Sequence, residues 1–233
     1  MENSLSRSAL IYGEEYIGKI SNANVIVFGL GGVGGYAVES LVRAGIGNLT
    51  IVDNDKISVT NLNRQLISLT SNIGKLKVDE WKIRILDINP NIKLIAKNMF
   101  LTADNLEEFD LKQFDYILDA IDTVSSKIAL IKYAKENNIP IISSLGAGNR
   151  TNPNLIKIGD LKETSYDPLA KVIRHELRKD NITHLDVIYS TEIPLKVIVG
   201  NDNQSKRSPG STSFIPAIFG EMMAGYVINK LVK

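Results

Sequence analysis

The segment Gly29-Leu-Gly31-Gly32-Val-Gly34 constrains the fold more than any other part of this 233-residue chain. It follows the apolar, β-type run Asn24–Phe28 and precedes a helical pattern over Tyr36–Arg43. Glycines at this spacing let the backbone approach a phosphate, and the N-terminus of the helix supplies free N–H groups and the positive end of its dipole. We therefore expect a strand–loop–helix unit that binds a nucleotide.

Strand and helix patterns alternate through the first two thirds of the chain. Further β-type runs occur at Leu49–Val52, Ile92–Ala96, Tyr116–Leu118 and Pro140–Ser143, and helical patterns at Lys75–Ile88 and Ser125–Asn137. Such alternation is typical of βαβ units around a parallel sheet. The predicted fold class is α/β, with a doubly wound, Rossmann-like, mostly parallel sheet.

The pattern changes from about Ile156. Two further β-type runs are separated by a basic helical pattern and followed by a polar stretch and an apolar helix: Ile156–Asp160, Leu185–Ser190, Asp167–Lys179, Gly200–Ser213 and Ile215–Leu231. We predict an antiparallel C-terminal extension of the sheet, with a mobile loop over the polar stretch. No linker is evident, so residues 1–233 are predicted to form a single domain. Its nucleotide-binding part covers about 1–150 and its substrate-facing part about 151–233.

The composition excludes several kinds of chemistry. The chain has no cysteine and only two histidines, which excludes disulfides, thiolate catalysis and cysteine-ligated zinc. The formal charge of +1 means that any nucleic-acid contact depends on a local patch. The first twelve residues are polar rather than signal-like, and the apolar run Val25–Val38 is too short and too rich in glycine to span a bilayer. A cytoplasmic protein without membrane contact is expected.

Asp53 lies at the end of the second predicted strand, where its carboxylate could accept hydrogen bonds from a ribose. The glycine loop and this aspartate alone would favour NAD. However, Asn61, Arg64 and Lys77 follow, and then the acidic pair Asp119 and Asp122. Cations and a metal-binding carboxylate suit a triphosphate under attack better than a dinucleotide.

From Arg7 to about Gly148 the chain resembles the adenylating core of the ubiquitin-activating superfamily, which includes the activating enzymes of the molybdopterin and thiamine pathways. The resemblance is carried by the glycine loop, Asp53, Asn61-x-x-Arg64, Lys77 and Asp122.

This resemblance implies a role for each of these residues. The glycine loop and Asp53 would hold the nucleotide, and the cofactors would be ATP and Mg²⁺. Asn61, Arg64 and Lys77 would clamp the phosphates, while Asp122 would bind the Mg²⁺.

Other positions extend the predicted site or leave alternatives open. Asp55 is expected near the nucleotide, and Arg7 matches an arginine that in relatives reaches the nucleotide of the partner subunit, which implies a homodimer. A surface location is the alternative for Arg64 and Lys77. Asp119 either joins the site or only caps the turn that follows it.

Three segments of the second half narrow the resemblance. They are Gly146-Ala-Gly148-Asn149, the stretch Asp160–Arg178 and the stretch Ser208–Pro216. Together they resemble the tRNA threonylcarbamoyladenosine dehydratase branch of the superfamily. This branch implies ATP-dependent adenylation of the threonyl carboxylate on a modified adenosine beside the anticodon, followed by ring closure with loss of water.

The tRNA would be the substrate partner, and the basic helix is the candidate surface for it. Candidate contacts are Lys171, Arg174, Arg178 and Lys179, with Lys206 and Arg207 on the polar loop. The first three share a helix face at i, i+3 and i+7. An ordinary solvated helix face is the alternative. A role for His175 in catalysis is not expected.

Two rival functions stay open at this point. One is an adenylyltransferase for the C-terminal glycine of a ubiquitin-like sulfur-carrier protein; the other is an NAD-binding dehydrogenase or sensor. An accessory sulfur-relay protein is a further possible partner.

Overall fold

The computed structural model describes residues 4–196 and 209–233. Its strands are β1 (Asn24–Phe28), β2 (Asn48–Val52), β3 (Lys93–Lys97), β4 (Tyr116–Asp119), β5 (Ile141–Ser144), β6 (Ile156–Asp160) and β7 (Asp186–Ser190). Its α-helices are α1 (Ser6–Tyr12), α2 (Glu15–Asn22), α3 (Gly34–Arg43), α4 (Lys77–Ile88), α5 (Val124–Glu136), α6 (Pro168–Arg178) and α7 (Ile215–Val232). Short 3₁₀ turns, among them η1 (Val59–Asn61) and η3 (Ala103–Phe109), lie in the connections.

The strands form one sheet in the order β3-β2-β1-β4-β5-β7-β6. β1 pairs in parallel with both β2 and β4, so the chain winds outward in both directions from the β1/β4 boundary. Only β6 runs antiparallel, against β7. The structure therefore confirms the predicted doubly wound, mostly parallel sheet with an antiparallel C-terminal extension. Ligands bind to such sheets at the carboxyl ends of the strands where the winding reverses.

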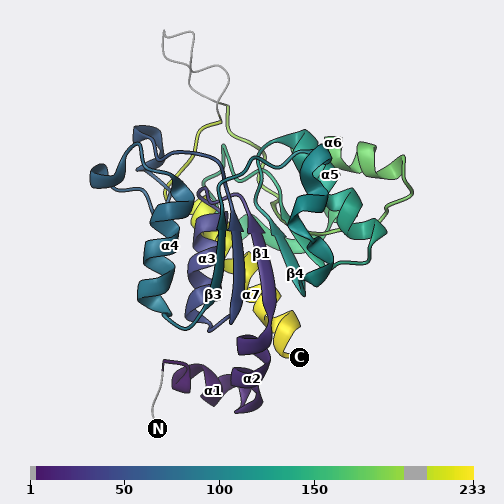
Figure 1. The fold of residues 1–233 in the computed structure, drawn as a ribbon. Helices are drawn as coiled ribbons and strands as arrows, with labels where there is room; N and C mark the ends of the chain where they lie inside the picture. Colours follow the sequence, from purple (N-terminus) through teal and green to yellow (C-terminus); the bar gives the residue numbers. More distant parts are fainter. Residues whose placement is uncertain (1–3, 197–208) are drawn as a thin grey trace.

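Helices cover both faces of the sheet (Figure 1). One apolar cluster lies beneath α3, α4 and α7 and contains the buried side chains of Trp81 and Phe219. The second lies beneath α5 and α6 and contains Phe109 and Ile173. Val25 and Val27 of β1 belong to the first cluster and Ile26 and Phe28 to the second, because successive residues of a strand point to opposite faces.

Most predicted elements appear within a few residues of their expected bounds. The helix expected over Lys75–Ile88 begins at Lys77, and the last helix covers Ile215–Val232. Residues 209–213 form neither helix nor strand, whereas the rest of the predicted polar loop, with Lys206 and Arg207, lies outside the described residues.

The sequence analysis missed the two N-terminal helices. α1 and α2 contain seven and eight residues, too few to show a clear 3.6-residue repeat. Tertiary contacts hold α2, since Tyr16 and Ile20 are buried and the Tyr16 hydroxyl donates to the Ala44 carbonyl at 2.5 Å.

No helix in the described part of the chain is long and apolar enough to cross a bilayer.

Candidate active site

The glycine loop leaves β1 at Phe28 and enters α3 at Gly34, as predicted. Gly29 has φ +85°, and a Cβ there would lie 2.6 Å from the Ala120 carbonyl oxygen. A Cβ on Gly34 would lie 1.8 Å from the Gly29 carbonyl oxygen. Side chains cannot fit at either position, so these glycines let the loop fold tightly against the end of β4.

Asp53 follows β2 and is tied to the glycine loop. Its Oδ2 accepts a hydrogen bond from the Leu30 N–H at 2.6 Å, and its Oδ1 accepts from the Asp55 N–H at 2.7 Å. The side chain is 8% exposed. Burial raises the pKa of the Asp53 carboxyl above its ordinary value, although the positive charge of Lys77 opposes this effect.

Lys77, the first residue of α4, is directed at these two carboxylates. Its Nζ lies 2.7 Å from Asp55 Oδ2 and 3.7 Å from Asp53 Oδ2, and the residue is 3% exposed. The surface alternative for Lys77 is therefore wrong. A buried cation beside two acidic groups at the end of a parallel sheet makes this position a candidate functional site.

Asn61 and Arg64 come from the η1 turn. The Asn61 Oδ1 accepts a hydrogen bond from the Ser58 N–H at 2.9 Å, so this side chain shapes the turn. Arg64 is half-buried, and its Nη1 donates to the Thr60 carbonyl at 2.8 Å and to Asn63 Oδ1 at 2.9 Å. Its guanidinium keeps further donors for a ligand.

The two aspartates that the sequence analysis treated as a pair, Asp119 and Asp122, differ in burial. Asp119, the last residue of β4, is fully buried and accepts a hydrogen bond from the Ile121 N–H at 3.1 Å, which is the capping alternative considered for it. Asp122 is exposed, and its Oδ1 accepts a long hydrogen bond from the Thr123 hydroxyl at 3.5 Å. Of these two aspartates, only Asp122 lines the cavity described next.

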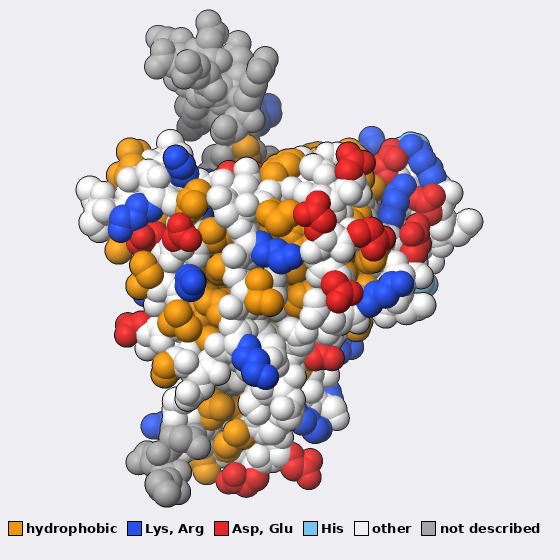
Figure 2. Space-filling view, viewed as in Figure 1, with side chains coloured by type: hydrophobic (Ala, Val, Ile, Leu, Met, Phe, Trp, Pro, Cys, Tyr) orange, Lys and Arg blue, Asp and Glu red, His pale blue; other side chains and the backbone are white. Residues whose placement is uncertain are grey.

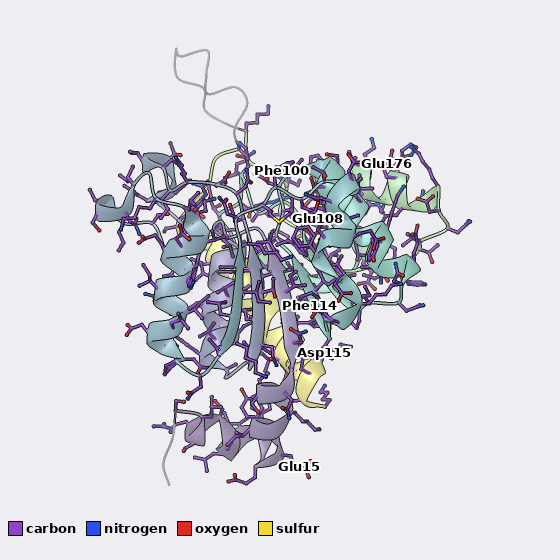
Figure 3. The ribbon with its side chains drawn as sticks, viewed as in Figure 1. Glu15, Phe100, Glu108, Phe114, Asp115 and Glu176 are labelled. Carbon is purple, nitrogen blue, oxygen red and sulfur yellow. The ribbon has the colours of Figure 1, made fainter. Side chains whose placement is uncertain are left out.

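A cavity of about 790 Å³ opens at the carboxyl ends of the strands. Predicted nucleotide-site residues that line it are Gly29, Gly31, Gly32, Asp53, Asp55, Asn61, Arg64, Lys77 and Asp122. Gly34 is buried behind the loop. Met99, Phe100 and Leu101, which follow β3, add an apolar wall that the sequence analysis missed. Figure 3 shows Phe100 at this end of the sheet and Asp115 at the opposite end.

The far wall of the cavity is formed by the turn after β5 and the segment before α7. The Gly210 N–H donates to Asn149 Oδ1 at 2.7 Å, and the Asn149 N–H donates to the Gly210 carbonyl at 2.8 Å. The Asn63 amide donates to the Ser211 carbonyl at 3.1 Å, which links this segment to the turn that carries Arg64.

Arg150 lies behind that wall, and the sequence analysis gave it no role. Its side chain is 1% exposed, and its Nη2 lies 4.0 Å from Asp167 Oδ2. Within the described residues its Nε and Nη1 have no hydrogen-bond partner. Burial lowers the pKa of the Arg150 guanidinium, while the charges of Asp167 and Glu192 oppose this shift. No short motif marks such a residue in a sequence.

The expected basic face of α6 forms only in part. Lys171, Arg178 and Lys179 are exposed, and Lys179 Nζ lies 2.8 Å from Glu176 Oε1. Arg174 instead turns inward, where its Nη1 donates to the Leu161 carbonyl at 3.0 Å and to the Thr164 carbonyl and hydroxyl. This guanidinium joins α6 to the turn after β6, so the prediction of one continuous basic face is corrected.

Arg7 is exposed on α1 and does not line the cavity of its own chain. Figure 1 shows α1 at the amino-terminal end of the sheet, opposite the glycine loop. Within one chain, Arg7 therefore lies apart from the other predicted catalytic residues, Arg64, Lys77 and Asp122, which line the cavity.

A family model described as the ThiF family matches residues 5–233. This chain belongs to the ThiF family. The match covers the nucleotide-binding part and the segment from β6 to α7 alike.

Within the ThiF family, the chain is similar to proteins that share one name. It is 42% identical over 244 residues to the tRNA threonylcarbamoyladenosine dehydratase of Bacillus subtilis, which covers 100% of this chain and 96% of that protein. It is 38% identical over 193 residues to the Escherichia coli protein of the same name, covering 79% of this chain and 72% of that one.

A solved structure agrees with these similarities. The Escherichia coli tRNA N6-threonylcarbamoyladenosine dehydratase in complex with ATP superposes with a TM-score of 0.89 at 33% identity, over 98% of this chain and 93% of that chain. The fold of that ATP complex is thus the fold described above.

Proposed function

We propose that this ThiF-family chain is an ATP-dependent tRNA threonylcarbamoyladenosine dehydratase. The observation that carries the proposal is one cavity that combines a glycine loop, two cations and an exposed carboxylate, in a chain similar over its whole length to dehydratases of that name. The enzyme adenylates the threonyl carboxylate of the modified adenosine, and the product forms by intramolecular ring closure.

ATP occupies the half of the cavity nearest the glycine loop. The loop N–H groups and the N-terminus of α3 receive a phosphate. The Asp53 carboxylate accepts hydrogen bonds from the ribose hydroxyls, and the apolar wall that contains Phe100 packs against the base. Arg64 and Lys77 contact the phosphates.

The donor set of the cavity suits Mg²⁺ held between protein and phosphates. No cluster of three or more acidic or histidine side chains that could hold a metal occurs in residues 4–196 and 209–233. Mg²⁺ in nucleotide sites is commonly bound by one or two carboxylates together with phosphate oxygens and water, and Asp122 supplies one exposed carboxylate at the cavity. When bound, the ion neutralises charge that develops on the leaving pyrophosphate.

The cations serve the first step of the reaction. A carboxylate oxygen of the substrate attacks the α-phosphorus, an acyl adenylate forms and pyrophosphate leaves. Arg64 and Lys77 stabilise the negative charge on that leaving group.

Ring closure needs no nucleophile from the protein. An atom of the substrate's own side chain attacks the activated carbonyl and displaces AMP, with net loss of water from the nucleoside. Well-oriented intramolecular reactions reach effective molarities of about 10⁵ M or more. A chain without cysteine can therefore complete the reaction.

The substrate nucleoside occupies the part of the cavity beside its far wall, which Gly146–Gly148 and Pro209–Ser211 form together. The tRNA backbone contacts Lys171, Arg178 and Lys179 on α6, because these cations are exposed. The two halves, about 1–150 and 151–233, act as one domain.

A homodimer completes the site by supplying Arg7 from the partner. Leu10 and Ile11 on α1 are 83% and 81% exposed, and Ile83 on α4 and Ile95 on β3 are 65% and 55% exposed. Figure 2 shows hydrophobic side chains spread over the face that contains these elements. Exposed apolar side chains on this scale favour association with a second surface.

Mass spectrometry of nucleosides tests the reaction and the substrate together. Threonylcarbamoylated tRNA is incubated with the protein, ATP and Mg²⁺, and the expected result is loss of one water from that nucleoside, dependent on ATP. An unchanged nucleoside, together with ATP–pyrophosphate exchange driven by a ubiquitin-like carrier, would instead support the sulfur-carrier adenylyltransferase. Tight NAD binding without either reaction would support the dehydrogenase class.

Mixing two inactive variants tests the shared site. Arg7→Ala and Asp122→Asn are each expected to lose activity, and a mixture that exchanges subunits is expected to recover part of it. A mixture that stays inactive after verified exchange contradicts the supply of Arg7 from the partner.

A further inference from the structure

A fully buried ion pair lies directly behind the segment that carries Asp122. Lys127 Nζ lies 2.7 Å from Asp119 Oδ2, and both side chains are 0% exposed. The Ser143 hydroxyl donates to the same Oδ2 at 2.8 Å, and Lys127 Nζ also donates to the Ser144 carbonyl at 3.0 Å. The group joins β4, β5 and α5.

Stability alone is a weak reason for such a pair. Removing two charges from water carries a desolvation cost that their attraction often fails to exceed, so apolar side chains of similar volume commonly serve a core equally well. Specific placement of a neighbouring group is a better reason. The other oxygen of Asp119, Oδ1, identifies that group by the hydrogen bond it accepts.

The second Asp119 oxygen holds the start of the segment that contains Asp122. Oδ1 accepts a hydrogen bond from the Ile121 N–H at 3.1 Å. The Ala120 N–H donates to the Phe28 carbonyl at 2.8 Å, and at the other end the Lys127 N–H donates to the Thr123 carbonyl at 3.0 Å. Asp122 therefore lies in a short segment whose backbone is hydrogen-bonded on both sides of this residue.

The segment also has no space to shift toward the glycine loop. The position that a Cβ on Gly29 would take lies 2.6 Å from the Ala120 carbonyl oxygen, so the backbones of the two loops are in direct contact. Rotation of the peptide between Ala120 and Ile121 would break the bond to Asp119 or press on the glycine loop. The Asp119 carboxylate thus helps to fix the backbone from which the Asp122 side chain extends.

We propose that Asp119, held in place by Lys127 and Ser143, is a positioning residue that directs the Asp122 carboxylate toward the phosphates of the nucleotide. Asp119 does not contact the ligand itself, because both of its oxygens are bonded inside the protein. The proposal rests on the proposed role of Asp122 in the nucleotide site. Since misplacement of a functional group by about 1 Å can cost about 10²-fold in rate, the effect is measurable.

Two double variants separate positioning from stability. Asp119→Asn with Lys127→Met and Asp119→Leu with Lys127→Met both remove the two charges, so neither leaves an uncompensated buried ion. They differ at one side chain of similar size. Asparagine keeps an oxygen that can accept from the Ile121 N–H, whereas leucine does not.

The first readout is binding rather than turnover. Calorimetric titration with ATP in the presence and absence of Mg²⁺ gives the factor by which the ion strengthens ATP binding. We expect the leucine variant to lose about tenfold or more of that factor and the asparagine variant to keep most of it. Hydrogen exchange at residues 120–123 is expected to be faster in the leucine variant alone.

Activity and folding complete the test. Both variants are expected to retain the far-UV circular dichroism and cooperative melting of the wild type, and adenylation by the leucine variant is expected to fall about 10²-fold. Equal behaviour of the two variants in titration and hydrogen exchange overturns the proposal. Ser143→Ala provides a milder second variant if either double variant fails to fold, and it is expected to shift the Mg²⁺ factor in the same direction.

Asp122→Asn distinguishes failure of this proposal from failure of the proposed function. If Asp122→Asn retains full Mg²⁺-dependent ATP binding and turnover, the role of Asp122 itself is wrong. If Asp122→Asn is impaired and the leucine variant equals the asparagine variant, only the positioning role of Asp119 is wrong.

Discussion

Replacement of Lys77 by methionine removes the buried cation that lies between two carboxylates and the cavity. Methionine has similar length, so the first turn of α4 keeps its packing. Lys77 Nζ lies 2.7 Å from Asp55 and 3.7 Å from Asp53. Without it, both carboxylates face an incoming triphosphate with no neighbouring positive charge. The pKa of Asp53, already raised by burial, rises further because the charge of Lys77 lowers it in the wild type.

The size of the loss follows from two independent estimates. Two unit charges about 4 Å apart interact by about 4 kcal/mol at an effective dielectric constant of about 20. Removing one donor that stabilises transition-state charge typically costs about 10²–10³ in kcat, or about 2.7–4 kcal/mol. These estimates agree, so we expect Lys77→Met to lower the rate of adenylation by at least about 10²-fold and to weaken ATP binding.

Lys75→Met is the matched control, because it removes a lysine only two residues away, just before α4. The Lys75 side chain is 56% exposed, bonds to Glu80 at 3.0 Å and does not line the cavity. The assay is single-turnover formation of AMP with quantitation of the dehydrated nucleoside, and melting curves check folding. A Lys77→Met enzyme that folds and turns over within about threefold of the Lys75→Met control refutes the reasoning.

Three further predictions concern stability. In α7, a Cβ on Gly220 would lie 2.2 Å from the Val33 carbonyl oxygen, whereas a Cβ on Gly225 would have no neighbouring atom within 4 Å among the described residues. We expect Gly220→Ala to lower the urea-derived free energy of unfolding by about 1–3 kcal/mol. Gly225→Ala should leave that free energy unchanged or raise it by up to about 1 kcal/mol. Burial favours a higher pKa for Glu39, but hydrogen bonds from two arginines outweigh it and lower the pKa below 4.5. The stability that Glu39 contributes is therefore present above pH 4.5 and lost as pH falls through the lowered native pKa. Melting temperatures of wild type and Glu39→Gln should differ most above pH 4.5 and converge only below the native pKa. Arg174→Ala should destabilise the fold by about 1.5–3 kcal/mol because its charged donor bonds to buried carbonyls, whereas Arg178→Ala should change the free energy of unfolding by less than about 0.5 kcal/mol; equal values for the two arginines would contradict the inward placement of Arg174.

The sheet was predictable where burial on both faces produces apolar runs. β1, for example, has four consecutive buried residues after its first, and such runs are typical of parallel strands covered by helices. The edge strand β3 alternates exposed and half-buried positions, so its signal is weaker. α1 and α2 are too short to show a 3.6-residue repeat, and α2 is held by contacts with a distant segment, such as the bond from the Tyr16 hydroxyl to the Ala44 carbonyl.

The site was predictable to the extent that its sequence motifs directly follow the carboxyl ends of strands. In a parallel sheet these termini meet at one edge, which brings the glycine loop, Asp53 and Asp122 together although they are far apart in sequence. The direction of each side chain was not predictable. Spacing alone places Arg174 beside Lys171 and Arg178, but the carbonyls to which Arg174 donates belong to a turn ten or more residues away. Similarly, no local pattern separates a buried Asp119 from an exposed Asp122.

Charge buried at the carboxyl edge of the sheet links stability to ligand binding. Asp53, Lys77 and Arg150 have side chains that are 8%, 4% and 1% exposed, and within the described residues Arg150 leaves two donors unpaired. Burial raises the pKa of Asp53 and lowers that of Arg150, so the fold holds both groups in environments that oppose their charged forms. Apolar side chains would make this edge more stable, and polar groups kept at such a cost commonly mark functional sites. In the proposed site ATP binds the folded state with its charge beside Lys77, so the proposal predicts that the melting temperature rises with ATP concentration, as binding linkage requires. The Lys77→Met protein should lose most of that rise, measured from its own ligand-free melting temperature.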